Sequence, residues 1–209
     1  MSIFLITGTS GAGKTSLTHE LKKCGYWDGC ISHTTRPMRT GEVDGETYYF
    51  VSKEEFKRMC ENNEFAECVI YHGDYYGVSH AEIEHTMKKG NHIFIIVAYD
   101  GYLQIKEQYP DAIGIFIWAT KEDCFNNMIE RGDSPASVNE RISTYEQEML
   151  NRYMYDYVVK NVRGKFSDTA SILKSIVNQY NNYQQLLIEH NKYKKRLEAI
   201  RKVDNNSIN

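Results

Sequence analysis

Four short apolar runs recur along the chain between stretches of helical periodicity. The runs are Ile3–Thr7, His92–Ala98, Ile113–Ala119 and Tyr157–Val159. The later runs lack alternation between apolar and polar residues, as is typical of parallel strands that are covered on both faces. The pattern therefore predicts an α/β fold, with a parallel sheet flanked by helices.

Residues 32–80 have a different texture, rich in Tyr, Thr, Gly and charged residues. Short antiparallel strands joined by turns are expected there at Thr47–Val51, Phe65–Tyr71 and Tyr75–Val78. This segment lies between the first and second apolar runs. We therefore expect a mixed β lobe, bounded at residues 32–87, that is inserted into the α/β core.

Side-chain caps predict the helices of this lobe. Ser52–Glu55 and Ser79–Glu82 both match the capping-box pattern. The first predicts a helix from Lys53 to about residue 62, and the second predicts a helix that Gly90 ends.

A helical pair is expected between the last two apolar runs. Thr120 can cap a helix that runs to Arg131, and Gly132–Pro135 interrupts it. A further helix is expected over about Ser137–Tyr153. The pair is a candidate lid, bounded at residues 121–153.

These boundaries predict one domain at residues 1–180, whose core is formed by residues 1–31, 88–120 and 154–180. Residues 181–209 are expected to form a helical C-terminal extension. Apolar or tolerated residues in the last helical region return at nearly three-four spacing, so the helix could form a homodimer seam. Packing back onto the core is an equal alternative.

Composition excludes several classes of partner. The 209 residues carry a net charge of −3, which gives no strong field toward nucleic acid or an acidic membrane. No apolar stretch reaches membrane-spanning length. The five cysteines are odd in number and form no C-x-x-C pair, so reduced thiols in the cytoplasm are expected.

The first apolar run leads directly into a complete phosphate-binding motif. Gly8–Thr15 reads GTSGAGKT, which matches G-x-x-x-x-G-K-[ST], and a helix is expected from Lys14. Backbone N–H groups of such a loop curl around phosphates, and the positive end of the helix points at them. Lys14 can reach the β- and γ-phosphates, and the Thr15 hydroxyl can hold Mg²⁺. A P-loop NTPase-type sheet that binds ATP is therefore expected.

The inserted lobe holds a candidate second phosphate site. Arg36 and Arg39 are three residues apart and are followed by Glu42. Two guanidiniums at this spacing can clamp one phosphate. Taken without the P-loop, they would read as solvated surface charges.

The combination resembles the guanylate kinase family over about residues 1–180. The matching segments, in order, are GTSGAGKTS, SHTTRPMRTGEVDGETYYFVS, FAE at 65–67, YYGVS at 75–79, ERG at 130–132 with Arg141, and YDYVVKN at 155–161. The resemblance implies a nucleoside monophosphate kinase that uses Mg²⁺ and transfers the γ-phosphate of ATP to GMP or dGMP.

The resemblance also implies roles for individual residues. The ATP-binding set is Gly8, Ser10, Gly11, Ala12, Gly13, Lys14, Thr15, Ser16 and Asn161. The acceptor-binding set is Ser32, Arg36, Arg39, Glu42, Tyr48, Glu67, Tyr76, Val78 and Ser79. Within it, Glu42 orients the arginine pair and Glu67 accepts hydrogen bonds from the guanine N1 and N2 edge. Lys14, Arg39, Arg131 and Arg141 are the implied catalytic residues, the last two as arginines of the lid.

Several positions depart from the family pattern. Val78 stands where the family usually has a hydroxyl donor to guanine O6, and Ser79 is either the next family position or a plain helix cap. Ile96 and Ala98 stand where the family has acids. Asp100 lies two residues further on, and either substitutes for them or forms a turn.

These departures leave the base of the acceptor open. Asn127 also replaces one lid arginine. GMP or dGMP is the first expectation, and another nucleoside monophosphate, such as dUMP or a modified pyrimidine nucleotide, is the alternative. A catalytically inactive module that binds a protein is a third hypothesis, which the intact P-loop disfavours.

Overall fold

The computed structural model describes residues 2–39 and 41–180, together with residues 182, 189 and 192. Contacts divide the chain into two units, Met1–Ala170 and Ser171–Asn209. The second unit is helical over residues 171–180. Most of the predicted homodimer seam and of the extension at 181–209 lies outside the described residues. The predicted domain boundaries stay predictions.

The core is the predicted parallel sheet. Its order is β2-β7-β1-β8-β9, and every neighbouring pair is parallel. The strands are β1 (Ile3–Gly8), β2 (Trp27–Gly29), β7 (His92–Ile96), β8 (Ile113–Trp118) and β9 (Tyr157–Lys160). The four apolar runs of the sequence thus supply four strands. The fifth, β2, was not predicted, because three residues with a central aspartate make no apolar run.

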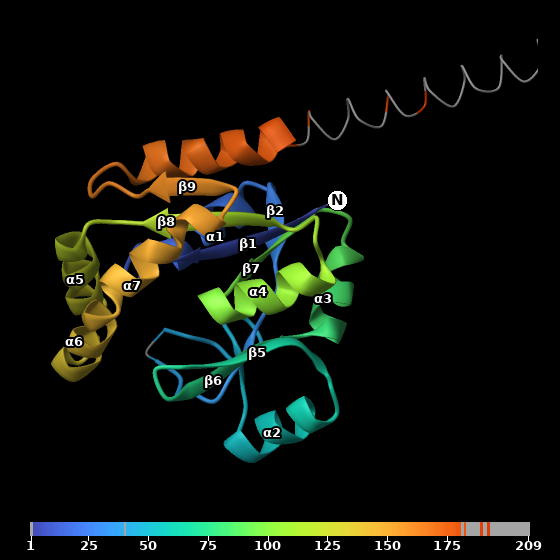
Figure 1. Cartoon of the computed structure of the whole chain (residues 1–209), viewed down its shortest axis with the longest axis horizontal. Coiled ribbons are helices and arrows are strands. Elements are labelled where there is room, and N and C mark those ends of the chain that lie inside the picture. Colours follow the sequence, from blue (N-terminus) through green and yellow to red (C-terminus); the bar gives the residue numbers. More distant parts are fainter. Residues whose placement is uncertain (1, 40, 181, 183–188, 190–191, 193–209) are drawn as a thin grey trace, which may run out of the picture. The chain divides into compact units, whose positions relative to one another are not determined.

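Helices pack against this sheet and follow its strands in sequence. Helix α1 (Lys14–Lys23) follows β1, and α4 (Tyr99–Gln108) follows β7. Figure 1 shows α3 (His80–Met87) and α4 next to each other below the sheet. The central strands are fully buried at Leu5, Ile95 and Ile115, which fixes the position of the strand ends that carry the site.

The inserted lobe has a second sheet in the order β4-β3-β6-β5. Its elements are β3 (His33–Thr34), β4 (Tyr49–Phe50), β5 (Phe65–Tyr71), β6 (Asp74–Ser79) and α2 (Lys53–Glu61). The mixed lobe is confirmed, but the expectation that Thr47–Val51 is antiparallel is wrong. Only Tyr49–Phe50 forms a strand, and it runs parallel to β3, to which the long connection over residues 35–48 returns the chain. Ser52 and Ser79 cap α2 and α3 as predicted.

The lid contains more helices than expected. Thr120 caps α5 (Lys121–Glu130) as predicted. The single helix predicted over Ser137–Tyr153 is wrong, since the segment forms α6 (Pro135–Ser143), α7 (Tyr145–Leu150) and the 3₁₀ helix η1 (Asn151–Met154). At the break the Thr144 hydroxyl donates to Arg141 O at 2.9 Å, a local bond that competes with helix continuation.

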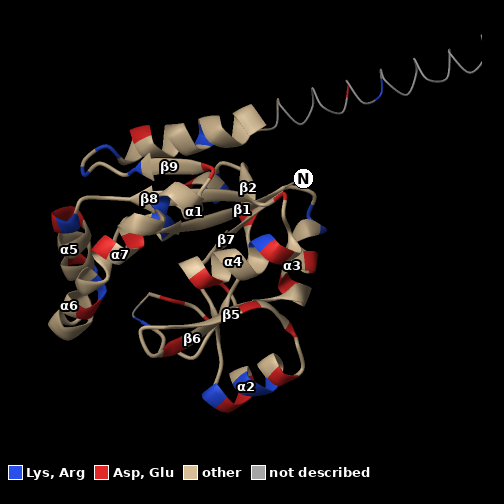
Figure 2. Cartoon of the chain, viewed as in Figure 1, with Lys and Arg blue, Asp and Glu red and all other residues tan. Residues whose placement is uncertain are grey.

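Charge on the described helices is mixed. Helix α2 carries three basic and three acidic residues, whereas α5 carries one lysine at its start and three acidic residues (Figure 2). Over the part of the chain that the structure describes, no helix has both the length and the apolar character needed to cross a membrane.

Candidate active site

One cavity of about 1140 Å³ opens at the carboxyl ends of the core strands, between the P-loop, the inserted lobe and the lid. Ligands of open α/β sheets bind at this edge. The cavity brings together the following predicted site residues: Gly8, Ser10, Gly11, Ala12, Gly13, Lys14, Thr15, Ser16, Ser32, Arg36, Arg39, Glu42, Tyr48, Glu67, Tyr76, Arg131, Arg141 and Asn161. Val78 and Ser79 do not line it.

The P-loop joins β1 to α1 with backbone angles that suit glycine. Gly8 has a φ of 130°, and a Cβ there would overlap the carbonyl oxygen of Ile117 in β8. Helix α1 begins without a side-chain cap, because its N-cap is Gly13. The backbone N–H groups of its first turn are therefore available to an anion.

Lys14 is held by the loop itself. Its Nζ donates to Gly8 O at 2.7 Å and to Thr9 O at 2.9 Å. Burial lowers the pKa of Lys14, against the effect of the nearby Glu148 carboxylate, which raises it. When a phosphate group enters the loop, the Lys14 ammonium group can donate to phosphate oxygens in place of these two carbonyl oxygens.

The protein supplies few metal ligands in the cavity, so a bound metal ion would need further oxygen ligands from a nucleotide. Within the described residues no group of three or more His, Cys, Asp or Glu could hold a metal ion. Thr15 is exposed at the start of α1 and lines the cavity. Mg²⁺ commonly uses one or two protein oxygens together with phosphate oxygens and water, so this donor set fits Mg²⁺ that arrives with a nucleotide.

The arginine motif of the lobe forms a closed network with Glu42. Arg36 Nη2 donates to Glu42 Oε1 at 2.8 Å, and the Arg39 backbone N–H donates to Glu42 Oε2 at 2.7 Å. Burial alone would raise the pKa of Glu42, but these hydrogen bonds hold it below its ordinary value. The Arg36 guanidinium lies 5.6 Å from the centroid of the Tyr48 ring. Glu42 thus fixes Arg36 and the backbone that carries Arg39.

Glu67 presents a buried carboxyl group on the wall of the cavity. Its exposed fraction is 3%, and Oε2 has no hydrogen-bond partner among the described residues. A Cβ at position 101 would stand 2.6 Å from this oxygen, so Gly101 makes room for it. Burial raises the pKa of Glu67 to about 8, against a hydrogen bond from the Val78 backbone that lowers it.

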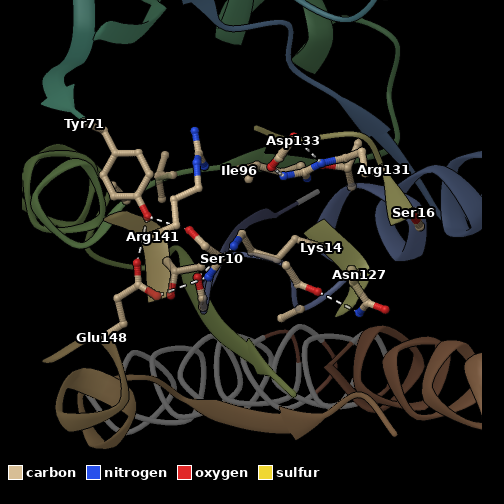
Figure 3. Close-up of a pocket in the computed structure, with 18 of the residues that line it drawn as sticks. Ser10, Lys14, Ser16, Tyr71, Ile96, Asn127, Arg131, Asp133, Arg141 and Glu148 are labelled. Carbon is tan, nitrogen blue, oxygen red and sulfur yellow. Dashed lines mark hydrogen bonds and ion pairs between the residues drawn. The ribbon is translucent and has the colours of Figure 1, made fainter. Parts of the chain in front are cut away.

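Arginines of the lobe and the lid meet at Asp133. Arg131 forms an ion pair with Asp133 (Figure 3). Arg39 Nη2 lies 3.8 Å from Asp133 Oδ1. Only 3% of the Asp133 side chain is exposed, against 33% for Arg39 and 45% for Arg131. Arg141 lines the same cavity. Three cations therefore surround the space between the P-loop and the acceptor lobe.

Comparisons with known proteins agree with this geometry. The guanylate kinase family model matches residues 1–180. The chain belongs to the guanylate kinase family.

Individual relatives align with this chain over most of their own length. The guanylate kinase of Shewanella sp. (strain MR-7) is 36% identical over 180 residues, which cover 84% of this chain and 86% of the relative. That of Clostridioides difficile (strain 630) is 34% identical over 200 residues, which cover 93% and 97%. The crystal structure of guanylate kinase from Anaplasma phagocytophilum has a TM-score of 0.67 at 25% identity and covers 86% of each chain.

Of the positions that the resemblance singled out around the base and the metal, some lie away from the cavity of this guanylate kinase family member. Val78 is fully buried, and the Ser79 side chain accepts the Glu82 backbone N–H as the cap of α3. Asp100 is exposed in the first turn of α4 and does not line the cavity. Ile96 and Ala98 do line it and present apolar surface.

Sequence reasoning missed several polar residues of the site, Asp133 among them. Tyr71 and Glu148 contact each other and Ser10, and Asn127 Nδ2 donates to Gly11 O at 2.9 Å (Figure 3). Asn127 therefore braces the P-loop from α5. The sequence offered only the substitution at position 127 as a signal, because these contacts join segments that are far apart in the chain.

Proposed function

We propose that the protein transfers the γ-phosphate of ATP to GMP or dGMP, releasing ADP and (d)GDP. The observation that carries this proposal is a single cavity with the P-loop at one side and the partnerless carboxyl oxygen of Glu67 at another. The curated relatives bear the name guanylate kinase, which supports the same reaction. We propose a cytoplasmic enzyme, in keeping with cysteines that are all free in the structure.

On the donor side, the P-loop amides and Lys14 would hold the phosphates of ATP. Asn161 lies against the loop, where its Nδ2 donates to Ala12 O at 2.9 Å. Thr15 would hold Mg²⁺ through its hydroxyl. When bound with ATP, the ion supplies positive charge to the phosphate oxygens.

On the acceptor side, Ser32, Arg36, Arg39, Tyr48 and Tyr76 would bind the monophosphate, and Glu42 keeps the arginines in place. Glu67 would accept the N1 and N2 hydrogens of guanine. A buried acceptor without a partner costs free energy, and a base with two N–H donors on one edge relieves this cost.

Between the two nucleotides, Lys14, Arg39, Arg131 and Arg141 would stabilise the charge on the phosphoryl group during in-line transfer. An acceptor phosphate oxygen attacks the γ-phosphorus, and the bond from phosphorus to the ADP oxygen breaks. Closure of the lid over these cations would exclude water, which competes as an acceptor.

Another base remains a second candidate because Ile96 and Ala98 present apolar surface to the cavity. A uracil or thymine edge has one N–H donor and needs fewer polar partners than guanine. The chemistry and the arginine network would be the same.

An acceptor panel tests both candidates. Ribo- and deoxyribonucleoside monophosphates of all the common bases are incubated with Mg-ATP, and ADP release is measured. We expect the highest kcat/KM with GMP or dGMP, by about tenfold or more over each pyrimidine, because Glu67 discriminates by hydrogen bonding. A pyrimidine preference would replace the acceptor, and no turnover with any acceptor would reject the kinase activity in favour of an inactive binding module.

Glu42→Gln tests the acceptor-phosphate site. The neutral amide weakens two hydrogen bonds that involve a carboxylate, so the KM for the acceptor is expected to rise about tenfold at nearly constant kcat. Glu46→Gln, at an exposed position of the same segment, is the matched control. An unchanged KM for the acceptor in Glu42→Gln would contradict the role of Glu42.

A further inference from the structure

Tyr71 joins three parts of the molecule through one hydroxyl group. It ends β5 in the acceptor lobe, and its OH donates to Glu148 Oε1 of α7 at 2.7 Å. The same oxygen lies 2.9 Å from Ser10 Oγ in the P-loop. Because the phenol proton goes to Glu148, Ser10 is the donor to the phenol oxygen. Figure 3 shows the three side chains converging in the cavity.

Glu148 also forms a hydrogen bond with the backbone of the P-loop. Its second oxygen, Oε2, accepts the Ser10 backbone N–H at 3.1 Å. The carboxylate thus holds one peptide of the phosphate-binding loop with one oxygen and the lobe with the other. A hydrogen bond to a carboxylate is stronger than one between neutral groups.

The ring of Tyr71 lies near two residues with proposed roles in transfer. The Arg141 guanidinium is 6.0 Å from the ring centroid. The Tyr76 ring, on the acceptor side, is 6.4 Å away at an interplanar angle of 75°. Tyr71 therefore contacts the donor loop, a lid arginine and the acceptor-phosphate site at once.

The phenol remains a donor at neutral pH. Burial, and then the Glu148 carboxylate, raise the pKa of Tyr71 well above its ordinary value. The OH group is therefore protonated at neutral pH and can donate to the Glu148 carboxyl group.

We propose that Tyr71 is a positioning residue that couples the acceptor lobe to the P-loop, so that binding of the acceptor and binding of ATP strengthen each other. The proposal rests on the kinase activity proposed above. The Tyr71 hydroxyl reaches Ser10 and Glu148 only while the lobe stands against the P-loop and α7. An acceptor that holds the lobe in this position thereby orders the loop for ATP, and ATP must favour acceptor binding by the same factor.

Tyr71→Phe tests this coupling, since it keeps the ring and removes only the hydroxyl. Binding of a non-hydrolysable ATP analogue with Mg²⁺ is measured by calorimetry with and without saturating GMP, or the best acceptor of the panel. In the natural protein we expect the acceptor to tighten analogue binding about five- to tenfold. In Tyr71→Phe this factor is expected to fall to about twofold or less, and kcat to fall about tenfold, with little change in analogue binding alone.

Tyr102→Phe is the matched control. Tyr102 is buried, its OH donates to Met154 O at 3.1 Å, and it does not line the cavity. Its removal costs one phenol hydrogen bond elsewhere in the fold, so coupling and kcat are expected to stay as in the natural protein. Glu148→Gln in the Tyr71→Phe background should lower the coupling factor by less than it does alone, because Tyr71→Phe has already removed the bond between the lobe and Glu148 and only the bond to the Ser10 N–H is left to weaken.

The outcomes separate this proposal from the kinase activity. Full coupling and full kcat in Tyr71→Phe, with normal acceptor turnover by the natural protein, overturn the coupling role alone. Equal losses in Tyr71→Phe and Tyr102→Phe that follow a lower Tm also overturn it, since they show a purely structural effect. If no nucleoside monophosphate binds or reacts in the panel, both proposals fail.

Discussion

Replacing Lys14 with methionine is expected to lower kcat by about a thousandfold. A single neutral donor to a developing negative charge contributes about a hundred- to a thousandfold, and Lys14 supplies a full positive charge. Its ammonium is buried and held by Gly8 O and Thr9 O, directly on the loop that would receive the phosphates. Steady-state kinetics with Mg-ATP and the best acceptor give the value.

The fold should survive this change, which makes the result specific. Burial lowers the pKa of Lys14, so the charged form is disfavoured there. An apolar side chain of similar length removes this cost, and the Tm is expected to stay equal or rise. Lys53→Met, at the exposed start of α2, is the control. Activity in Lys14→Met within about tenfold of the natural level would contradict the role of Lys14.

Local patterns explain why much of the fold was predictable. Continuous apolar runs identify β1, β7, β8 and β9, because parallel strands are buried on both faces. The caps at Ser52, Ser79 and Thr120 act within a few residues, and all three helix starts are confirmed. In contrast, β2 is a strand only because it pairs with β7, and no local pattern records that pairing.

In the candidate site, too, residues within one segment were predictable, and residues brought together from distant segments were not. The P-loop and the arginine motif each lie in one segment. The P-loop spacing identified Lys14, whereas Arg36 and Arg39 needed the P-loop and the family resemblance beside their spacing. Tyr71 and Glu148 lie 77 positions apart and meet only in the folded chain. Val78 and Ser79 show the opposite case. The family resemblance placed them near the base, whereas in the structure Val78 is buried and Ser79 caps α3.

The raised pKa of Glu67 makes the free energy of unfolding depend on pH. Burial raises its pKa from 4.5 to about 8, so the folded protein holds this proton more tightly than the unfolded chain does. The contribution of this proton to the free energy of unfolding is fully present below the unfolded pKa of 4.5. It declines as the pH rises from there to about 8, by at most ~1.4 kcal/mol for each pH unit. Glu67→Gln lacks this slope, which urea unfolding at two pH values in the window can show.

The same proton links Glu67 to the acceptor. Guanine N1–H and N2–H require an ionised carboxylate, so GMP binding should release the proton. We expect GMP affinity to rise up to about tenfold per pH unit below about pH 8 and to level off above it. In Glu67→Gln the affinity should be about a hundredfold lower at high pH and lack this dependence, because the hydrogen bonds to a charged acceptor are lost.

Calorimetry at several pH values, in buffers of different ionisation enthalpy, measures both the affinity and the released proton. The GMP phosphate also titrates near this range, but it does so equally in the Glu67→Gln variant, so the difference between the two proteins isolates Glu67. Tighter GMP binding at low pH in the natural protein would show that the protonated carboxyl contacts the base. A protonated carboxyl pairs with one carbonyl and one N–H, an edge that uracil and thymine share with guanine, so that result would favour the pyrimidine acceptors that Ile96 and Ala98 leave open.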